Sequence, residues 1–328
     1  MVRELDVNRL RVLVEVAHAG SIAEAARTLA FTPSALSQQI AKLEAELGAR
    51  LLERRPGGVV PTPVGAVLVE HGERVIGALR QARTAVDAAL GAQPRHLALG
   101  SFATAAQTLV PMALAELKSR YPEAELSLVD IEPPDGYGLV TSGDLDVLIT
   151  HRYPGVPPTS HPGLERRPLL DDPLRLVLPS GHQLAPRTPG IDLARLAEDT
   201  WISGALGIPN RVCLEHLARQ AEFEPRVAYE SADYHVILAL VGAGLGIALV
   251  PETVLAGADR SRVAVRELRG PTPAREIAVV HRRRPTVLVR ELTAFLRAAA
   301  DAVSGGGARK EGGAGSGPAR RPAGPGAG

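Results

Sequence analysis

Residues 21–48 read SIAEAARTLAFTPSALSQQIAKLEAELG and contain the start signals of two helices separated by a short break. Ser21 and Glu24 have the spacing of a capping box, which opens a helix predicted over residues 22–29. After a break at 30–32, Thr32 is the expected N-cap of the second helix and Pro33 its first residue. We therefore predict a helix-turn-helix pair.

The second helix of this pair has two chemically different faces. Its apolar residues form one stripe that ends before Gly48: Leu36, Ile40, Leu43 and Leu47. Small, amide or basic side chains lie on the opposite face: Ser34, Ser37, Gln38, Ala41 and Lys42. Glutamine can pair with adenine through two hydrogen bonds, and serine can bind either base type. The pattern favours a DNA-recognition helix in the major groove, with a three-helix bundle whose polar face is only solvated as the alternative.

The flanking segments complete a winged helix-turn-helix. Asp6 and Gly20 are capping signals around an upstream helix with one apolar face: Leu10, Leu13, Val14 and Ala17. Downstream, a Pro-Gly-Gly turn at 56–58 joins two short extended pieces at 51–54 and 59–61. The arginines beside this predicted wing are 50, 54 and 55. Cations beside a wing favour contacts with phosphates, the alternative being a solvated surface.

A long helix is predicted from Thr62-Pro63 to about residue 90. Its apolar stripe runs along its whole length: Val64, Leu68, His71, Val75, Leu79, Ala82, Val86 and Leu90. A single helix of this length needs a partner for that stripe. We expect the same helix of a second subunit to be the partner, with packing onto its own domain as the alternative.

These residues together resemble the LysR-type transcriptional regulators. The most specific stretch of the resemblance is Gly20-Ser21-Ile22, Ala25-Ala26, Leu29, residues 32–40, Leu43-Glu44, Leu47-Gly48, residues 51–54, Thr62 and Gly65. The resemblance implies DNA binding as a dimer or tetramer and a small-molecule co-inducer that tunes transcription. It implies DNA contacts by Thr32, Pro33, Ser34, Ser37, Gln38, Lys42, Arg54 and Thr62, to which Arg55 adds a charge.

The sequence departs from the family pattern at a few of these positions. Gln38 stands where family members often have arginine, and Gly57 and Val60 occupy wing positions that are frequently basic. Fewer phosphate contacts mean a weaker dependence of affinity on salt. We therefore expect a shallower salt dependence of DNA binding than in arginine-rich relatives.

Composition sets the limits for the rest of the chain. At 328 residues with 45% hydrophobic and 22% charged residues, it is an ordinary globular chain of about two domains. A net charge of +1 does not by itself announce nucleic-acid binding. No signal peptide or long apolar run is present, so we expect a cytoplasmic protein without a membrane partner. The single cysteine and the spacing of the nine histidines predict neither a metal site nor a cofactor.

After residue 93 the pattern changes to alternating strands and helices. Strands are predicted at 96–100, 125–131, 146–150, 174–179, 201–203, 226–230, 247–250, 263–268 and 277–281, and helices at 105–120, 138–142, 193–198, 209–222, 233–241 and 287–303. This alternation predicts an α/β domain with a largely parallel sheet.

The second region resembles the family's effector domain, which has two α/β lobes like those of periplasmic binding proteins. The predicted division is a DNA-binding domain at 1–61, a linker helix at 62–92, an effector domain at 93–303 and a disordered tail at 304–328. Residues 93–95 are the predicted hinge. The first lobe takes about 95–162 and 270–303, and the second about 166–265, with crossings near 162–170 and 265–272.

Ligands of open α/β sheets bind beyond the carboxyl ends of the strands. This rule selects candidate effector contacts at the predicted strand ends: Ser101, Phe102, Thr104, Ile131, Glu132, Thr150 and His151 in the first lobe, and Ser203, Gly204 and Ser231 in the second. Helix N-termini at these ends, assisted by Arg152, favour an anionic group such as a carboxylate. The alternative is that these polar residues only cap helices.

Two local patterns are not assigned a function. The glycine-rich stretch at 242–246 follows a predicted helix and precedes a strand, so we interpret it as a tight turn and not as a dinucleotide-binding loop. Cys213 lies within an apolar helical pattern and is predicted to be a buried small hydrophobic residue.

The sequence is thus interpreted as a non-enzymatic, effector-responsive transcription regulator. Its expected partners are double-stranded DNA, a small-molecule effector, further copies of itself and, as a candidate, RNA polymerase. Alternatives are a DNA-binding assembly protein without an effector and, less favoured, an α/β solute-binding protein or enzyme. No export signal or catalytic motif supports the last two.

Overall fold

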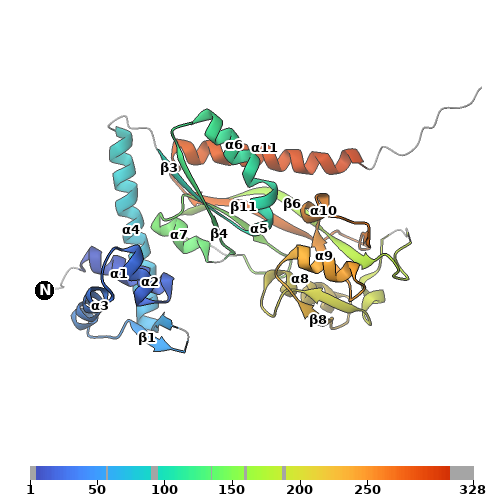
Figure 1. Ribbon diagram of the computed structural model, residues 1–328, viewed down its shortest axis with the longest axis horizontal. Helices are drawn as coiled ribbons and strands as arrows, with labels where there is room; N and C mark the ends of the chain where they lie inside the picture. Colours follow the sequence, from blue (N-terminus) through green and yellow to red (C-terminus); the bar gives the residue numbers. More distant parts are fainter. Residues whose placement is uncertain are drawn as a thin grey trace, which may run out of the picture.

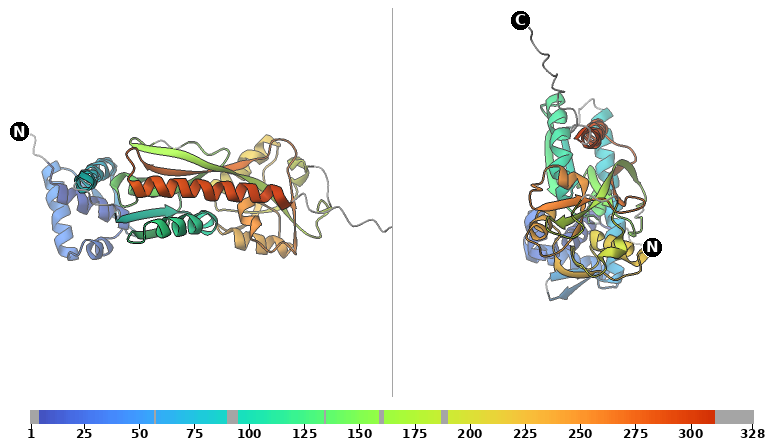
Figure 2. Two further views of the ribbon diagram at one scale, coloured as in Figure 1. Left: turned by 90° about the horizontal axis from the view of Figure 1, so that it is seen from above. Right: turned by 90° about the vertical axis from the view of Figure 1, so that its right-hand side faces the viewer.

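The structure is a computed structural model that describes residues 5–56, 58–89, 95–133, 135–158, 161–186 and 190–310. The molecule is elongated, with a small helical domain at one end and two α/β lobes extending from it (Figures 1 and 2). The predicted hinge residues Gln93 and Pro94, residue Gly57 of the wing and residues 311–328 of the predicted tail lie outside the described ranges.

The N-terminal domain is a winged helix-turn-helix. Its elements are α1 (Val7–Ala19), α2 (Ile22–Thr28), α3 (Pro33–Leu47), β1 (Leu52–Arg55) and β2 (Gly58–Pro61), the two strands being antiparallel. The predicted N-caps Asp6, Ser21 and Thr32 each accept a hydrogen bond from the first turn of their helix. Gly20 and Gly48 end α1 and α3 in the left-handed conformation, as predicted.

The core of this domain confirms most of the predicted stripe of α3. Leu36, Ile40 and Leu43 are buried against residues of α1, α2 and β1. Leu47 is 41% exposed, so its assignment to the buried stripe was wrong. It lies in the last turn of α3, beyond the region that the other helices cover. Ala17 is likewise only half-buried, whereas Val12 and Val16 complete the buried face of α1.

Helix α4 (Pro63–Ala89) packs within the chain through small residues and Ile76. Gly72 lies against Val14 of α1, and Gly77 lies against the carbonyl of Thr141 in α7 (Gly136–Ser142). The predicted stripe is instead largely exposed, with Val64, Val75, Leu79 and Val86 among the exposed large apolar residues. Leu68 of the stripe packs against the core of the N-terminal domain, but the other intrachain contacts of α4 named here lie outside the stripe.

A mixed sheet runs through both lobes. Its strand order is β10-β6-β11-β5-β3-β4, with β9 also paired to β6. The strands are β3 (His96–Ser101), β4 (Glu125–Asp130), β5 (Val147–Arg152), β6 (Leu164–Pro179), β9 (Ala248–Pro251), β10 (Val263–Arg266) and β11 (Ala274–Arg282), while β7 (Thr200–Ser203) and β8 (Arg226–Glu230) form a separate parallel pair. Strands β3, β4 and β5 are parallel as predicted, but β6, β9, β10 and β11 pair antiparallel, so the sheet is not largely parallel.

Strand β6 joins the lobes and differs most from the prediction. The predicted strand began at residue 174, whereas β6 begins at Leu164 and pairs with β11 up to Pro173 before it changes partner to β9 at Leu174. The register shifts where Pro168 pairs with Ala278, a place where proline's missing N–H is tolerated. The connection between the lobes is thus a continuous strand, which changes its pairing partner at Leu174.

The helices also differ from the prediction in detail. The predicted helix at 105–120 is two helices, α5 (Ala103–Thr108) and α6 (Val110–Arg120), because Pro111 cannot continue the hydrogen bonding of the preceding turn. The predicted helix at 193–198 is a 3-10 turn, η1 (Leu193–Leu196), and α10 (Glu252–Ala256) was not predicted. The remaining helices are α8 (Pro209–Gln220), α9 (Tyr234–Gly242) and α11 (Val287–Lys310).

Helix α11 continues past the predicted start of the tail at residue 304. Its buried residues, among them Leu292 and Leu296, belong to the core of the first lobe. Extension of an anchored helix adds a hydrogen bond for each residue, without the cost of nucleation. Residues 304–310 are therefore helical although their composition alone would not start a helix.

We use "first lobe" for β3, β4, β5 and β11 with α5, α6, α7 and α11, and "second lobe" for β7–β10 with α8, α9 and α10. The first lobe has its main core between the sheet and α5, α6 and α11, which cover the upper face of the sheet in Figure 1. The second lobe has separate cores around α9 and around Trp201. The stretch at 242–246 is the predicted turn between α9 and β9, with Gly244 left-handed, and Cys213 is buried as predicted.

Candidate nucleic-acid interface and effector cleft

The predicted recognition face of α3 is exposed along its whole length. Ser34, Ser37, Gln38 and Lys42 all face outward, as do Thr32 and Pro33 at the helix start. The Ser37 hydroxyl donates to the carbonyl of Pro33 at 2.9 Å, which leaves its lone pairs outward. The hydroxyl of Thr32 accepts from the amide of Ala35 at 3.2 Å. The inner face of α3 is therefore committed to the core while its outer face presents polar groups to solvent.

The wing adds cations next to this face. Arg54 and Arg55 are exposed on β1, and Arg55 forms an ion pair with Glu53 of the same strand. Within the described ranges, Lys42, Arg50 and Arg54 have no ion-pair partner. Unpaired exposed cations can bind phosphates without first giving up an internal contact. Arg54 is therefore better prepared than Arg55 for such a contact.

Thr62 has a structural position in addition to its predicted DNA contact. Its hydroxyl donates to the carbonyl of Arg50 at 2.8 Å and accepts from the amide of Gly65 at 3.0 Å. The amide of Thr62 donates to the carbonyl of Leu51 at 2.9 Å. Thr62 thus joins the start of the wing to the start of α4, and a DNA contact by this residue stays a prediction.

The predicted effector residues of the first lobe lie together at the ends of β3 and β5. Ser101, Phe102 and Thr150 are buried, and the Thr150 hydroxyl lies 3.3 Å from the hydroxyl of Tyr137. The His151 ring lies edge-on to Phe102, with 4.6 Å between ring centroids. Its Nε2 is 3.1 Å from Glu132, while Nδ1 is buried and has no hydrogen-bond partner among the described residues. Ile131 and Thr104 are half-buried beside this group.

In the second lobe, Ser203 ends β7 and Gly204 follows it, and both are buried. The amide of Ser231 donates to the carbonyl of Ser203 at 2.9 Å, so backbone pairing holds these two strand ends together. The Ser231 hydroxyl is engaged with Asp233, the N-cap residue of α9. Ser231 thus has a local structural role at the start of α9, and an effector contact by this residue stays a prediction.

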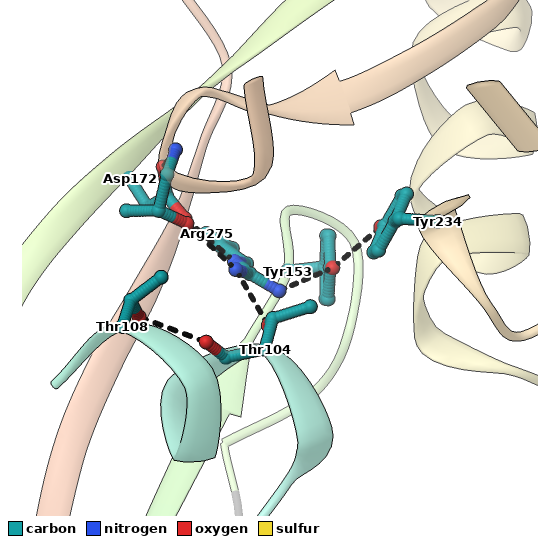
Figure 3. A network of polar contacts seen from close by, with 7 residues as sticks. Thr104, Thr108, Tyr153, Asp172, Tyr234 and Arg275 are labelled. Atoms are coloured by element: carbon teal, nitrogen blue, oxygen red, sulfur yellow. Dashed lines mark hydrogen bonds and ion pairs between the residues drawn. The ribbon is translucent and has the colours of Figure 1, made fainter. Parts of the chain in front are cut away.

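Where the two lobes meet lies a polar network of which the sequence analysis had singled out only Thr104 (Figure 3). Arg275 of β11 is 2% exposed, and its Nε donates to the fully buried carboxylate of Asp172 at 2.9 Å. Nη2 of Arg275 donates to the hydroxyls of Thr104 and Thr253 at 2.9 and 3.2 Å, and Nη1 donates to that of Tyr153 at 3.3 Å. One side chain thus reaches α5 in the first lobe and α10 in the second.

Two further contacts bridge the lobes. The hydroxyls of Tyr153 and Tyr234 lie 2.7 Å apart, and His235 Nε2 of α9 lies 3.2 Å from Gln107 of α5. Burial raises the pKa of Tyr153, although Arg275 opposes the shift, and burial raises the pKa of Tyr234 well above its ordinary value. Both phenols are therefore neutral hydrogen-bonding groups near neutral pH.

A sequence signal for this network existed. Arg275 precedes Ile277 and Val279 by two and four positions in a strand whose alternate residues face the core. A charged residue on the buried side of a strand indicates a paired or functional group. Its partner Asp172 stands 103 residues earlier in the chain, beyond the reach of any local pattern.

The structure also bears on metal binding and on membrane insertion. Among the residues that it describes, no cluster of histidine, cysteine, aspartate and glutamate side chains is arranged to hold a metal ion. In the same part of the chain, no helix combines the length and hydropathy that a membrane span requires.

Two family models match the chain. A model described as "Bacterial regulatory helix-turn-helix protein, lysR family" matches residues 7–66, and one described as "LysR substrate binding domain" matches residues 91–301. The first covers the helix-turn-helix and the wing, and the second covers both lobes.

Individual relatives agree with these models. The HTH-type transcriptional regulator CbbR of Xanthobacter flavus is 32% identical over 281 residues, covering 84% of this chain and 82% of that protein. Full-length OxyR C199D from Pseudomonas aeruginosa has a similar fold, with a TM-score of 0.65 at 22% identity over 91% of this chain and 95% of that one. Full-length CbnR complexed with its target DNA has a TM-score of 0.50 at 24% identity over 90% of this chain and 100% of that one.

Proposed function

The chain belongs to the LysR family of bacterial transcriptional regulators, and on this premise we propose that it binds operator DNA through the outer face of α3 and the wing. It is a DNA-binding regulator with an effector-binding domain. The proposed contacts are Thr32, Pro33, Ser34, Ser37, Gln38, Lys42, Arg54, Arg55 and Thr62. The observation that carries the proposal is the joint exposure of Ser34, Ser37 and Gln38 next to the exposed cation of Arg54.

The division of labour in this interface follows from side-chain chemistry. Gln38 and the serines carry both donors and acceptors, which suits them to base edges. Lys42 and Arg54 carry only charge-assisted donors, which suits them to phosphates. Base contacts set specificity and phosphate contacts set register and general affinity.

The DNA proposal is tested by fluorescence anisotropy with the intergenic fragment beside the gene. Gln38→Ala is expected to reduce discrimination between this fragment and random DNA by about 1–3 kcal/mol, the usual value of a good base contact. Gln220→Ala, at the exposed end of α8 in the second lobe, is the matched control. Equal discrimination by the wild type and Gln38→Ala would remove Gln38 from the interface.

For the effector we propose a small, carboxylate-bearing molecule bound between the lobes. The residues proposed to line its site are Ser101, Phe102, Thr104, Ile131, Thr150, His151, Ser203, Gly204 and Ser231. The burial of Phe102 and Thr150 beside a bridge between the lobes supports this location. A thermal-shift screen of metabolites followed by operator footprinting tests it. A footprint that no stabilising compound changes would favour a second domain that serves assembly alone.

We further propose that two chains associate through the exposed stripe of α4. Apolar residues of the stripe are open to solvent, Leu79 by 47% and Val86 by 53%. Leu79→Asp is expected to lower the mass measured by light scattering.

The boundaries 1–61, 62–92 and 93–303 are the proposed functional division. RNA polymerase is the proposed partner of the DNA-bound form, on the strength of the family's role in transcription.

A further inference from the structure

We propose that Arg275 is the effector-binding residue of this protein, and that the effector's carboxylate binds its Nη1–Nη2 edge in place of the Tyr153 hydroxyl. The inference rests on the proposed effector function and adds the recognising group, which none of the predicted strand-end residues supplies. It also adds a consequence for the lobes, because the displaced hydroxyl is part of a bridge between them.

Asp172 occupies only one side of the Arg275 guanidinium. Among the described residues, the Asp172 carboxylate accepts from Nε of Arg275 and from the amide and the hydroxyl of Thr253, the last two at 3.0 and 2.6 Å. Asp172 is therefore held on the far side of the guanidinium, and the terminal nitrogens point away from it (Figure 3). The edge that these nitrogens form has no anionic partner among the described residues and is closed by hydroxyl groups, with Arg275 2% exposed, so an acid reaches it only by displacing hydroxyls.

The terminal nitrogens of Arg275 bind only neutral groups among the described residues. Their acceptors are three neutral hydroxyls, and the one from Tyr153 is the most distant at 3.3 Å. Guanidinium groups bind carboxylates through two parallel hydrogen bonds that are roughly twice as strong as those to neutral acceptors. A carboxylate that reaches this edge would therefore replace Tyr153 on Nη1 and one of the two threonine hydroxyls on Nη2, because it is the better acceptor.

Aromatic rings lie around the Arg275 guanidinium. The Arg275 guanidinium lies over the rings of Phe102 and Tyr234, at 5.4 and 6.0 Å from their centroids. The His151 ring lies 5.2 Å from that of Tyr153, its side chain is 7% exposed, and its Nδ1 has no partner within the described ranges. The site thus combines aromatic walls, one cation and one unused hydrogen-bonding nitrogen, which suits a small planar acid with a second polar group.

The residues around Arg275 come from both lobes, which would link effector recognition to regulation. Tyr153 follows β5 of the first lobe, and Tyr234 begins α9 of the second. Arg275 lies on β11 beside the point where β6 changes partner from one lobe to the other. A carboxylate on Arg275 would free Tyr153 from this network and change how the lobes are tied together. Effector binding and lobe geometry would then be parts of one event.

The test uses the full-length protein and the fluorescence of Trp201, the single tryptophan of the chain, which lies in β7 two residues before Ser203. The probes are benzoate, pyruvate and succinate, each paired with its uncharged amide. At least one acid is expected to give a saturable signal in the millimolar range that its amide does not give. Equal binding of acids and amides, or no saturable signal with any acid, would overturn the proposal.

Two variants separate recognition from a purely structural role. Arg275→Lys keeps a cation next to Asp172 but cannot form the bidentate hydrogen bonds of a guanidinium. The affinity for the acid is therefore expected to fall by about tenfold or more. Tyr153→Phe removes the competing hydroxyl, so acid affinity is expected to rise. A merely structural network predicts that Tyr153→Phe weakens binding or leaves it unchanged, and either result counts against the proposal. Tyr229→Phe on the exposed strand β8 is the matched control.

Each preparation is also tested for binding to the promoter fragment without any acid. If the wild type does not bind the promoter fragment, the proposed function as a whole is contradicted. If the wild type binds the promoter fragment but Arg275→Lys binds the acid as tightly as the wild type does, only the role of Arg275 is overturned. Circular dichroism and thermal melting establish that each variant is folded. If Arg275→Lys does not fold, Tyr153→Phe remains as the test, because it keeps both charges of the network.

Discussion

Single side chains on α3 separate structure from recognition. The residues that hold α3 in the domain, such as Leu36 and Leu43, are fully buried, and those proposed to meet DNA are exposed. Substitutions at Ser34, Ser37 or Gln38 should therefore change DNA binding with little effect on stability. The same separation applies in the wing, where Leu51 is buried and Arg54 is exposed.

Arg54→Ala is expected to weaken binding to all DNA sequences to a similar extent. Removal of one phosphate contact should reduce the slope of log affinity against log salt by about 0.9 for each DNA-bound head. Anisotropy titrations over a range of salt concentrations measure both effects. Arg219→Ala, an exposed arginine of α8 in the second lobe, is the control. An unchanged slope in Arg54→Ala would place Arg54 away from the phosphates.

His18 should make stability depend on pH. A hydrogen bond to Glu73 at 2.7 Å raises the pKa of His18 above its ordinary 6.5, although partial burial opposes the shift. The folded state therefore holds the proton more tightly than the unfolded state. The resulting stability is fully present below about pH 6.5 and is lost as the pH rises through the folded pKa.

Denaturation of the wild type and of Glu73→Gln between about pH 5 and pH 9 measures this effect. The difference in free energy of unfolding between them should shrink as the pH rises. Burial lowers the pKa of His161 and Glu73 opposes that shift, so Glu73→Gln also makes the variant lose more stability as the pH falls, which acts in the same direction. A difference that stays constant with pH would show that the His18–Glu73 contact is not formed.

At the scale of elements, α7 connects the DNA-binding domain to the effector cleft. On one side it packs against α4, where Gly77 approaches Thr141 and Arg80 pairs with Asp144 at 2.6 Å. On the other side its Tyr137 hydroxyl meets Thr150 at the end of β5. Helix α7 is therefore in contact with both regions that a regulator has to couple.

Gly77→Ala should loosen this connection. A Cβ at residue 77 would overlap the carbonyl oxygen of Thr141, so α4 and α7 must separate. We expect stability to fall by about 1–3 kcal/mol, as is typical of overpacking. Faster amide hydrogen exchange in 136–142 is the second expected result. Ala78→Ser, at the neighbouring exposed position of α4, should leave both unchanged.

At the scale of the whole molecule, the two lobes are held together by a shared strand and a buried ion pair. Strand β6 pairs with β11 in the first lobe and with β9 and β10 in the second. Asp172 and Arg275 close this junction with exposed fractions of 0% and 2%. A buried charge without its partner is costly, whereas removing both charges often is not.

Asp172→Ala is therefore expected to destabilise the protein by about 3–5 kcal/mol, because Arg275 stays buried without a counter-charge. Urea denaturation followed by Trp201 fluorescence measures the destabilisation. The double variant Asp172→Leu with Arg275→Met should recover most of it. A double variant that is no more stable than the single one would show that packing, and not charge, holds the junction.

Local signals predicted the DNA-binding end in detail. The N-caps Asp6, Ser21 and Thr32 and the C-cap Gly20 are each where the sequence placed them. Such signals work because a cap and the turn that it satisfies lie within a few residues of each other. Errors occurred where a decision depended on distant packing, as for Leu47 at the end of α3.

The sequence by itself therefore determined the helix-turn-helix, the wing, the alternation of strands and helices in the lobes, and the family. Only the tertiary structure decided that β6 runs unbroken through both lobes, that α7 lies against α4, and that Asp172 meets Arg275 in the cleft. The physical reason is range. Caps and periodicity depend on neighbours in the chain, whereas a buried ion pair between residues 172 and 275 exists only when two strands have been brought side by side.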